Sequence, residues 1–192
     1  MLGSLGDSRA VLYRSEIGPV ATNIVHRPSK PSELKRIVAE GGQVCSIQGI
    51  DRVIKKTKNA TIGLSVSRAM GNYLLKDPKP IISSIPEFTE TVVDLDLDQF
   101  LVLGTDGVFD YVSDTEIGDL VSSTNNSRSA LQKTAEKIVQ LAKSRGSIDD
   151  RTIVIAKFAW NNPIIDDSPN EDDNIQQTQA LNDDDDDDIF KI

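Results

Sequence analysis

A chain of 192 residues, 38% of them hydrophobic and 27% charged, is long enough for one domain with a sizeable core. No stretch approaches the roughly 20 apolar residues of a membrane-spanning helix, and the first residues lack the pattern of a secretory signal, so we expect an intracellular protein of the cytoplasm or nucleus with no membrane partner. The formal net charge of −9 is uneven, because residues 161–192 carry eleven acids and one base, which leaves +1 for residues 1–160 and disfavours a basic face for nucleic acid.

The first quarter of the chain predicts two strands with a helix between them. The apolar run at 10–13 and the segment 43–47 are both typical of strands. Between them, residues 31–40 have apolar positions at helical spacing, with Pro31 at the start and the pair Gly41-Gly42 after the end. Proline in the first turn and glycine past the last turn are the usual signals of helix ends, so we expect a helix here.

The second half predicts two helices framed by strands. Residues 100–104 form a continuous apolar run, which is typical of a strand buried on both faces. Ser113 and Glu116 match a capping box and predict the start of a helix. A longer helix is expected over 129–143, where apolar residues return on one face, and a last strand over 152–158, where side chains alternate between two faces.

Two charged runs remain outside these elements. Residues 161–192 are polar and acidic without periodicity, so we expect residues 1–160 to fold and the rest to form a disordered acidic tail. The aspartate run 183–188 is typical of a solvated tail, with contact to basic partners as the alternative. A lysine cluster beside Asn59 indicates a solvated loop in preference to a binding patch; it consists of Lys55, Lys56 and Lys58.

Any chemistry here depends on carboxylates, because the chain offers one histidine and one cysteine. Aspartates at predicted strand ends and in tight turns are poorly explained by packing; they are Asp7, Asp106, Asp110, Asp149 and Asp150. Oxygen ligands suit Mg²⁺ or Mn²⁺ in preference to Zn²⁺. Gly107 lets the chain turn sharply after Asp106 without a Cβ clash, and Asp110 can return to the same side if a helical turn forms.

Each of these features also has an ordinary structural explanation. Asp106-Gly107 is a common turn dipeptide, and Asp7 close to Arg9 is a common ion pair. His26, the single histidine, has no evident partners for a Ser-His-Asp relay, so a structural role is favoured. Taken singly, none of the acids identifies a metal ligand.

Taken in order, five segments resemble those of a known family. They are GDSRAVL at 6–12, HRP followed by a helix and two glycines at 26–42, GLSVSRAMGN at 63–72, FLVLGTDGVFD at 100–110 and SIDDRTIVI at 147–155. Together they resemble the protein phosphatase 2C family, over about residues 6–158. Five ordered motifs at plausible spacing form a specific pattern, whereas one alone would be weak.

The resemblance implies both a fold and a reaction. The fold would be of the α+β class, a partial α-β-β-α sandwich in which two antiparallel sheets are flanked by helices and the N-terminal strands are missing. The reaction would be hydrolysis of phosphoserine or phosphothreonine in protein substrates by a metal-activated water, with no catalytic side chain forming a phosphoenzyme. A complete domain would hold two or three Mg²⁺ or Mn²⁺ ions.

The resemblance also assigns roles to single residues. Asp106 and Asp149 match direct ligands of the metal centre, and Asp110 and Asp7 match residues of an additional, weaker metal site. A second group would support these ligands as scaffold; it consists of Gly6, Arg9, Ser67, Arg68 and Gly107.

The family pattern is matched only in part. The family's N-terminal half carries an arginine that grips the phosphate, a Glu-Asp pair and a DGHGG segment whose aspartate bridges both metals, and none of these occurs here. The resemblance therefore implies a fragment or an incomplete copy, and we expect little or no activity from this chain alone. The alternative is an inactive pseudophosphatase that keeps the fold and acts as a binding or regulatory protein.

Overall fold

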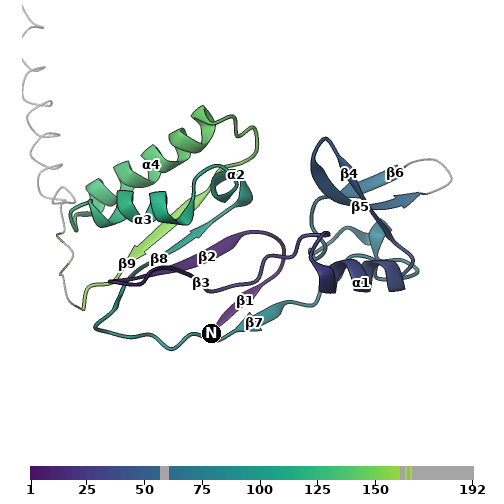
Figure 1. The fold of residues 1–192 in the computed structure, drawn as a ribbon, viewed down its shortest axis with the longest axis horizontal. Helices are drawn as coiled ribbons and strands as arrows, with labels where there is room; N and C mark the ends of the chain where they lie inside the picture. The colour runs from purple at the N-terminus through teal and green to yellow at the C-terminus, as the bar shows by residue number, and fades with distance from the viewer. Residues whose placement is uncertain (57–60, 161–162, 164, 166–192) are drawn as a thin grey trace, which may run out of the picture.

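The computed structural model describes residues 1–56, 61–160, 163 and 165. It has an α+β fold in which every strand pairing within the sheets is antiparallel, which confirms the predicted fold class. Figure 1 shows two groups of elements joined by a narrow middle region, a larger one with three helices and a smaller one around α1. The predicted acidic tail lies outside the described residues apart from positions 163 and 165.

The larger group is a four-stranded sheet with the strand order β3-β2-β8-β9. Its strands are β2 (Arg9–Arg14), β3 (Gly18–Ala21), β8 (Asp98–Gly104) and β9 (Ile153–Lys157). The helices α2 (Asp106–Phe109), α3 (Asp114–Ser122) and α4 (Arg128–Ser144) lie together on one face (Figure 1). The strands and helices expected from the sequence in this region are all present, within one or two residues at each end.

Within the described residues, helices cover one face of this sheet and leave the other without a helix. Phe100 and Val102 are fully buried against α3 and α4, whereas Leu101 and Leu103 between them are only partly buried. On the neighbouring strand, Val154 is 51% exposed. The prediction that the apolar run of β8 is buried on both faces was therefore wrong in part, because no helix covers the second face within the described residues.

The capping box predicts the start of α3 correctly. The Ser113 hydroxyl accepts a hydrogen bond from the Glu116 backbone N–H, and the Glu116 carboxylate accepts one from the Ser113 backbone N–H. Both bonds satisfy N–H groups that the first helical turn leaves without partners. Arg145 after α4 pairs with Glu116 at 2.6 Å, which ties the two helices together.

The smaller group packs α1 (Pro31–Ala39) on a sheet of three strands, β4 (Gln43–Ile47), β5 (Ile50–Lys56) and β6 (Thr61–Leu64). It has its own core, formed by Ile37, Val53, Leu75, Ile81 and Ile82. Leu75 belongs to the short 3₁₀ helix η1 (Tyr73–Leu75). This core is separate from that of the larger group, so the two groups are stabilised largely by their own contacts.

Between the groups, a short sheet joins β1 (Leu2–Ser4) to β7 (Glu87–Thr89). His26 is fully buried here, and its Nε2 lies 3.1 Å from the Glu87 carboxylate, while the Gly6 N–H donates to its Nδ1 at 3.2 Å. The structure therefore gives His26 the structural role that its sequence context favoured. Within the described residues, none of the helices combines the length and the apolar character needed to cross a bilayer.

Candidate functional site

The acids at strand ends meet at one edge of the four-stranded sheet. Gly104, the last residue of β8, pairs with the first residue of β2 and with the first residue of β9. Asp7 lies just before β2, Asp106 just after β8 and Asp149 just before β9. Antiparallel pairing places the start of one strand beside the end of its neighbour, so the register itself brings these three segments together.

A single cavity of about 470 Å³ is lined by the four aspartates to which the family resemblance assigns a metal role, Asp7, Asp106, Asp110 and Asp149; Asp150, the fifth that the sequence singled out, does not line it. Asp110 reaches it because α2 forms one helical turn, in which the Asp110 N–H donates to the Asp106 carbonyl at 2.9 Å. β5 and the segment after α2 supply further lining residues, among them Asp51, Arg52 and Tyr111. The structure thus brings the predicted acids to one place, while their role as metal ligands stays a prediction.

Asp7 and Asp106 lie close enough to influence each other's charge. Burial and, after it, the negative charge of Asp106 together raise the pKa of Asp7 from its usual value of 3.8 to about 6, although the nearby Arg27 acts in the opposite direction. The Asp7 side chain is only 15% exposed. Two neighbouring carboxylates in a partly buried site destabilise each other's ionised form, so the pair favours a bound proton or cation.

Arg27 and Arg52 both line this cavity, and Arg27 pairs with its aspartates. The Nη2 of Arg27 donates to both oxygens of Asp110, at 2.9 and 2.8 Å, and its Nε lies 3.8 Å from the Asp7 carboxylate. Sequence reasoning missed this residue as part of the site. The available signal was its position in the HRP segment at 26–28, which belongs to one of the five segments that carry the family resemblance.

Position 107 needs a glycine because there is no room for a Cβ atom, and not because the backbone adopts a positive φ. It lies within helix α2, and a Cβ atom on it would come within 2.4 Å of the Asp150 carbonyl oxygen. The Ser147 hydroxyl also donates to the Gly107 carbonyl at 2.7 Å, which holds the loop before β9 against α2. The Cβ clash that the sequence led us to expect at this position is therefore one with the backbone of the Asp149-Asp150 segment.

Thr105 adds a second tie between the same segments. Its hydroxyl donates to the Asp150 carbonyl at 2.9 Å and accepts from the Thr152 N–H at 3.1 Å. Its backbone N–H donates to the Thr152 carbonyl at 3.1 Å. These bonds hold the segments that carry Asp106 and Asp149 at the same edge of the sheet.

The residues expected to support the site have separate structural partners. Gly6 has a φ of +111°, a backbone conformation that side chains rarely adopt. Arg9 donates to Asp114 at 2.6 Å and lies over the Phe109 ring, 4.9 Å from its centroid. The sequence interpretation of Arg9 as a partner of Asp7 was wrong, because the alternation along β2 turns its side chain towards α3.

Ser67 and Arg68 belong to a network around the buried Glu33, outside the lining of the acidic cavity. Arg68 donates to the Glu33 carboxylate at 2.6 Å, and Arg36 donates to the same carboxylate at 2.9 Å and to the Ser67 carbonyl at 2.7 Å. Burial raises the pKa of Glu33, but the hydrogen bonds from Arg68 and Arg36 outweigh it and lower the pKa to about 2. This network fixes α1 relative to the middle region and leaves Ser67 and Arg68 away from the acidic cavity.

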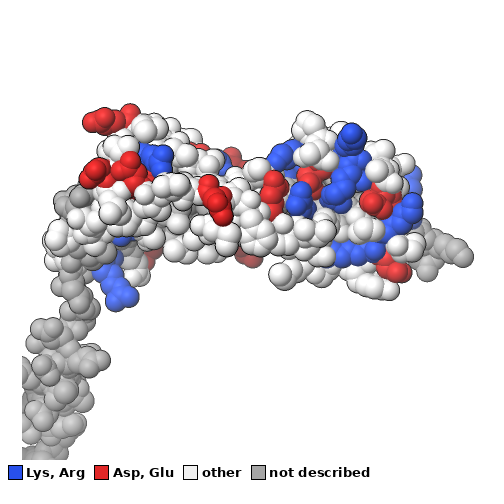
Figure 2. All heavy atoms as spheres, turned by 90° about the horizontal axis from the view of Figure 1, so that it is seen from below, with Lys and Arg blue, Asp and Glu red and all other residues white. Residues whose placement is uncertain are grey.

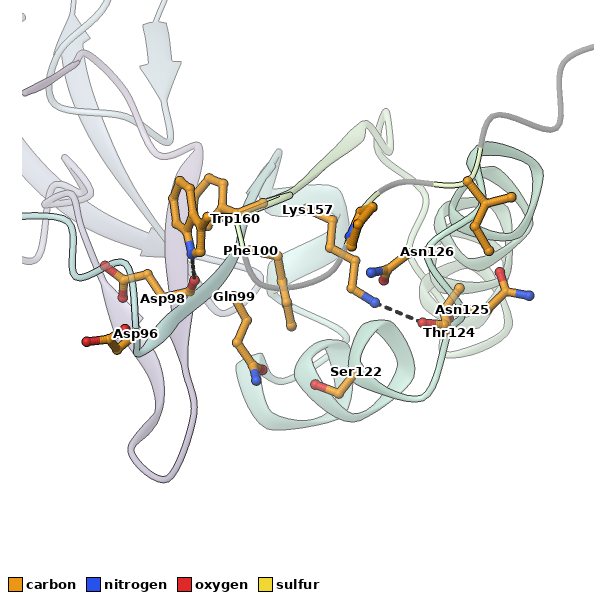
Figure 3. A pocket seen from close by; sticks show the side chains of 13 residues that line it. Asp96, Asp98, Gln99, Phe100, Ser122, Thr124, Asn125, Asn126, Lys157 and Trp160 are labelled. Carbon is orange, nitrogen blue, oxygen red and sulfur yellow. Dashed lines mark hydrogen bonds between the residues drawn. The ribbon is translucent and has the colours of Figure 1, made fainter.

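A second cavity, of about 530 Å³, lies at the other end of β8 (Figure 3). Lys157 points along it and donates to the Thr124 carbonyl at 2.8 Å, and the Trp160 indole donates to the Asp98 carbonyl at 2.9 Å. Asp98 is 1% exposed and pairs with Arg14 at 2.6 Å. Its burial as an ion pair explains this aspartate without a ligand role.

The acidic cavity fits a hard divalent cation by the type of its donors. All four of its candidate ligands are carboxylates, the donors that Mg²⁺ and Mn²⁺ prefer. In the conformation described, however, no three His, Cys, Asp or Glu side chains of residues 1–56, 61–160, 163 and 165 are grouped as a metal site. Asp110 is engaged by Arg27, and Asp149 is exposed.

Comparison with known proteins identifies the family. Residues 1–151 match the family model described as "Protein phosphatase 2C". A curated relative from Arabidopsis thaliana, "Probable protein phosphatase 2C 34", is 34% identical over 167 residues, which cover 82% of this chain and 46% of the relative. A second, "Protein kinase and PP2C-like domain-containing protein" from the same plant, is 31% identical over 154 residues, covering 80% of this chain and 21% of the relative.

Solved structures agree with these relatives. A phosphatase from a pathogenic strain of Toxoplasma gondii is similar with a TM-score of 0.66 and 26% identity, covering 82% of this chain and 47% of that one. A Caenorhabditis elegans sex determining protein has a TM-score of 0.65 and 26% identity, covering 80% of this chain and 35% of that one. Fold and sequence together place the chain in the phosphatase class. It spans less than half the length of each of these relatives. The chain belongs to the protein phosphatase 2C family.

Proposed function

We propose that this chain provides part of the catalytic centre of a metal-dependent protein serine/threonine phosphatase. The observation that carries the proposal is the convergence of four aspartates from three segments on one cavity, at the edge where β2, β8 and β9 meet. Family membership supports phosphoprotein as the substrate, and phosphoserine and phosphothreonine as its reactive groups. An intracellular location, in the cytoplasm or nucleus, is part of the same proposal, as is the absence of nucleic acid and membrane partners.

Asp106 and Asp149 are the residues proposed to hold Mg²⁺ or Mn²⁺, with Asp7 and Asp110 contributing to a further ion. When bound, divalent ions acidify a water molecule and neutralise charge on the phosphoryl oxygens. The hydrogen bonds described for Thr105 and Ser147 keep the segments that carry Asp106 and Asp149 at one edge of the sheet, which supports a common ion between them. The cost of ionising the Asp7-Asp106 pair favours cation uptake at neutral pH.

Arg27 is proposed to neutralise the acids until a cation or a phosphate arrives. It holds Asp110 through two hydrogen bonds and lies beside Asp7. A guanidinium group at 38% side-chain exposure can also reach the cavity mouth, where its planar donors suit phosphate oxygens. The residue would therefore exchange one anionic partner for another during binding.

The alternative function is that of a pseudophosphatase that binds partners without catalysis. Two observations favour it: no group of three ligands is assembled within the described residues, and Arg27 occupies Asp110. The two functions differ in one property, because only a phosphatase releases phosphate from a phosphothreonine peptide.

The test is Mn²⁺-dependent phosphate release from a phosphothreonine peptide, measured on the longest protein that the transcript encodes. The proposal predicts that Asp106→Ala lowers kcat/KM by at least about 100-fold, because it removes a direct ligand of the metal centre. The matched control is Asp119→Ala, an exposed aspartate on α3, which should leave the rate unchanged. Equal rates for the parent and Asp106→Ala would refute the proposal, and absence of activity in the parent would favour the pseudophosphatase.

A further inference from the structure

The smaller group of elements carries most of the positive charge of the molecule. Residues 27–86 contain eleven Lys and Arg against four Asp and Glu, a net charge of +7, whereas residues 87–160 contain seven against thirteen, a net charge of −6. Figure 2 shows basic side chains gathered over the part of the surface formed by the smaller group. A surface of this sign attracts acidic partners and speeds their association.

A hollow of about 450 Å³ in this surface is lined by three lysines. We call it the lysine hollow: Lys55, Lys56 and Lys79 form its charged rim, and Ile54 and Ile81 contribute apolar surface. Glu40 is the one acidic residue that lines it. The sequence interpretation of Lys55 and Lys56 as part of a solvated loop was wrong, because both belong to β5; Lys58 lies outside the described residues.

The lysines that line this hollow form no ion pair with the described residues. Among the described residues every ion pair uses an arginine or His26, and none uses a lysine. Lys55 is anchored by hydrogen bonds from its Nζ to the carbonyls of Leu74 and Asp77. Lys56 and Lys79 are exposed, so their ammonium groups are accessible to an anionic partner.

Strand β5 connects the lysine hollow to the acidic cavity. Its first residues, Ile50 to Arg52, line the acidic cavity, and its last residues, Ile54 to Lys56, line the lysine hollow. A strand rises about 3.3 Å per residue, so the five steps from Asp51 to Lys56 span about 17 Å. An extended peptide with a phosphorylated residue in the acidic cavity would reach the hollow with residues about five positions away.

We propose that the lysine hollow docks an acidic segment of the phosphoprotein substrate, a few residues away from the phosphorylated position. The proposal rests on the proposed function in one respect, since it takes the acidic cavity as the place where the phosphorylated residue binds. The docking itself requires no catalysis. The occupant is a run of carboxylates, because ammonium groups form the rim and apolar side chains cover only the floor. Docking of this kind would give preference among substrates and would leave the chemical step unchanged.

The experiment measures binding of a fluorescein-labelled, unphosphorylated peptide that carries five glutamates, by fluorescence anisotropy with the full chain. The variant Lys56→Glu/Lys79→Glu reverses two exposed charges and keeps the anchored Lys55. The matched control is Lys133→Glu/Lys137→Glu, which reverses two exposed charges on α4. We expect affinity for the peptide to fall by about tenfold in the first variant and by less than about twofold in the control.

Three outcomes would overturn the proposal. The first is equal weakening by the two double variants, which would show a general charge effect. The second is equal binding of a peptide with glutamine in place of glutamate. The third is peptide binding that appears only after Asp183–Asp188 are changed to asparagine, which would assign the hollow to the chain's own acidic run. Because no phosphate is released in this measurement, its failure would leave the proposed phosphatase function untouched.

Discussion

Replacing Asp7 by asparagine should stabilise the metal-free chain at neutral pH. In the folded protein burial, and then the charge of Asp106, raise the pKa of Asp7 to about 6, whereas the unfolded chain titrates at about 3.8. Below pH 3.8 both states carry the proton and the group has no effect. As pH rises from 3.8 to 6, unfolding releases a proton, so the carboxylate lowers the stability of the folded state, and above pH 6 the penalty is complete.

The size of this penalty follows from the two pKa values. The difference between the pKa of Asp7 in the folded and in the unfolded chain lowers the free energy of unfolding by about 3 kcal/mol at pH 7.5 and by about 0.5 kcal/mol at pH 4. Asparagine is nearly isosteric and its amide can donate to Asp106 as the protonated carboxyl does, so Asp7→Asn should remove the penalty without opening a cavity. The variant should therefore be more stable than the parent by up to about 3 kcal/mol at pH 7.5.

Urea denaturation in the presence of a chelator, at pH 4 and pH 7.5, measures this difference. Asp119→Asn removes the same charge from the exposed face of α3 and should show no comparable gain. A variant that is less stable than the parent at pH 7.5, or a gain of equal size at both pH values, would show that Asp7 and Asp106 do not interact as described.

Three further substitutions test the supports of the fold and the site. Gly107→Ala should destabilise the chain by about 2 kcal/mol in thermal unfolding, because the added Cβ meets the Asp150 carbonyl; an unchanged melting temperature would contradict this close approach. Ser113→Ala should lower the free energy of unfolding by about 1 kcal/mol, because it removes the N-cap of α3. A denaturant titration measures this loss, and an unchanged free energy of unfolding would contradict the capping role. Glu33→Gln should cost about 3 kcal/mol at pH 7, since it leaves Arg68 without its buried partner. The pKa of Glu33 is about 2, so this last cost should shrink as pH falls from 4.5 towards 2, and a pH-independent cost would contradict the ion pair.

Features that depend on local spacing were predictable from the sequence. The capping box at Ser113 and Glu116 appears as expected, because both partners lie within one helical turn. Asp110 comes to the same cavity as Asp106 for the same reason. The alternation of β9 was also read correctly, since the period of a strand is fixed by its geometry.

Features that depend on distant segments were not predictable. Arg27 joins Asp110 across 83 positions, and nothing in the HRP segment shows that the partner of this arginine is the residue just after α2. The Arg9-Asp114 pair spans 105 positions, so the nearer Asp7 was the natural but incorrect partner. Burial of Asp98 depends on Arg14 on the neighbouring strand, which only the sheet register reveals.

Binding of Mn²⁺ to the chain tests the central claim most directly. Electron paramagnetic resonance reports free Mn²⁺ and therefore measures even weak binding, with a dissociation constant on the order of 1 mM. If Asp106 and Asp149 share a cation at the edge where β2, β8 and β9 meet, Asp106→Asn and Asp149→Asn should each abolish this binding, and Asp119→Asn should retain it. Binding of equal strength in the parent, Asp106→Asn and Asp149→Asn would contradict the account.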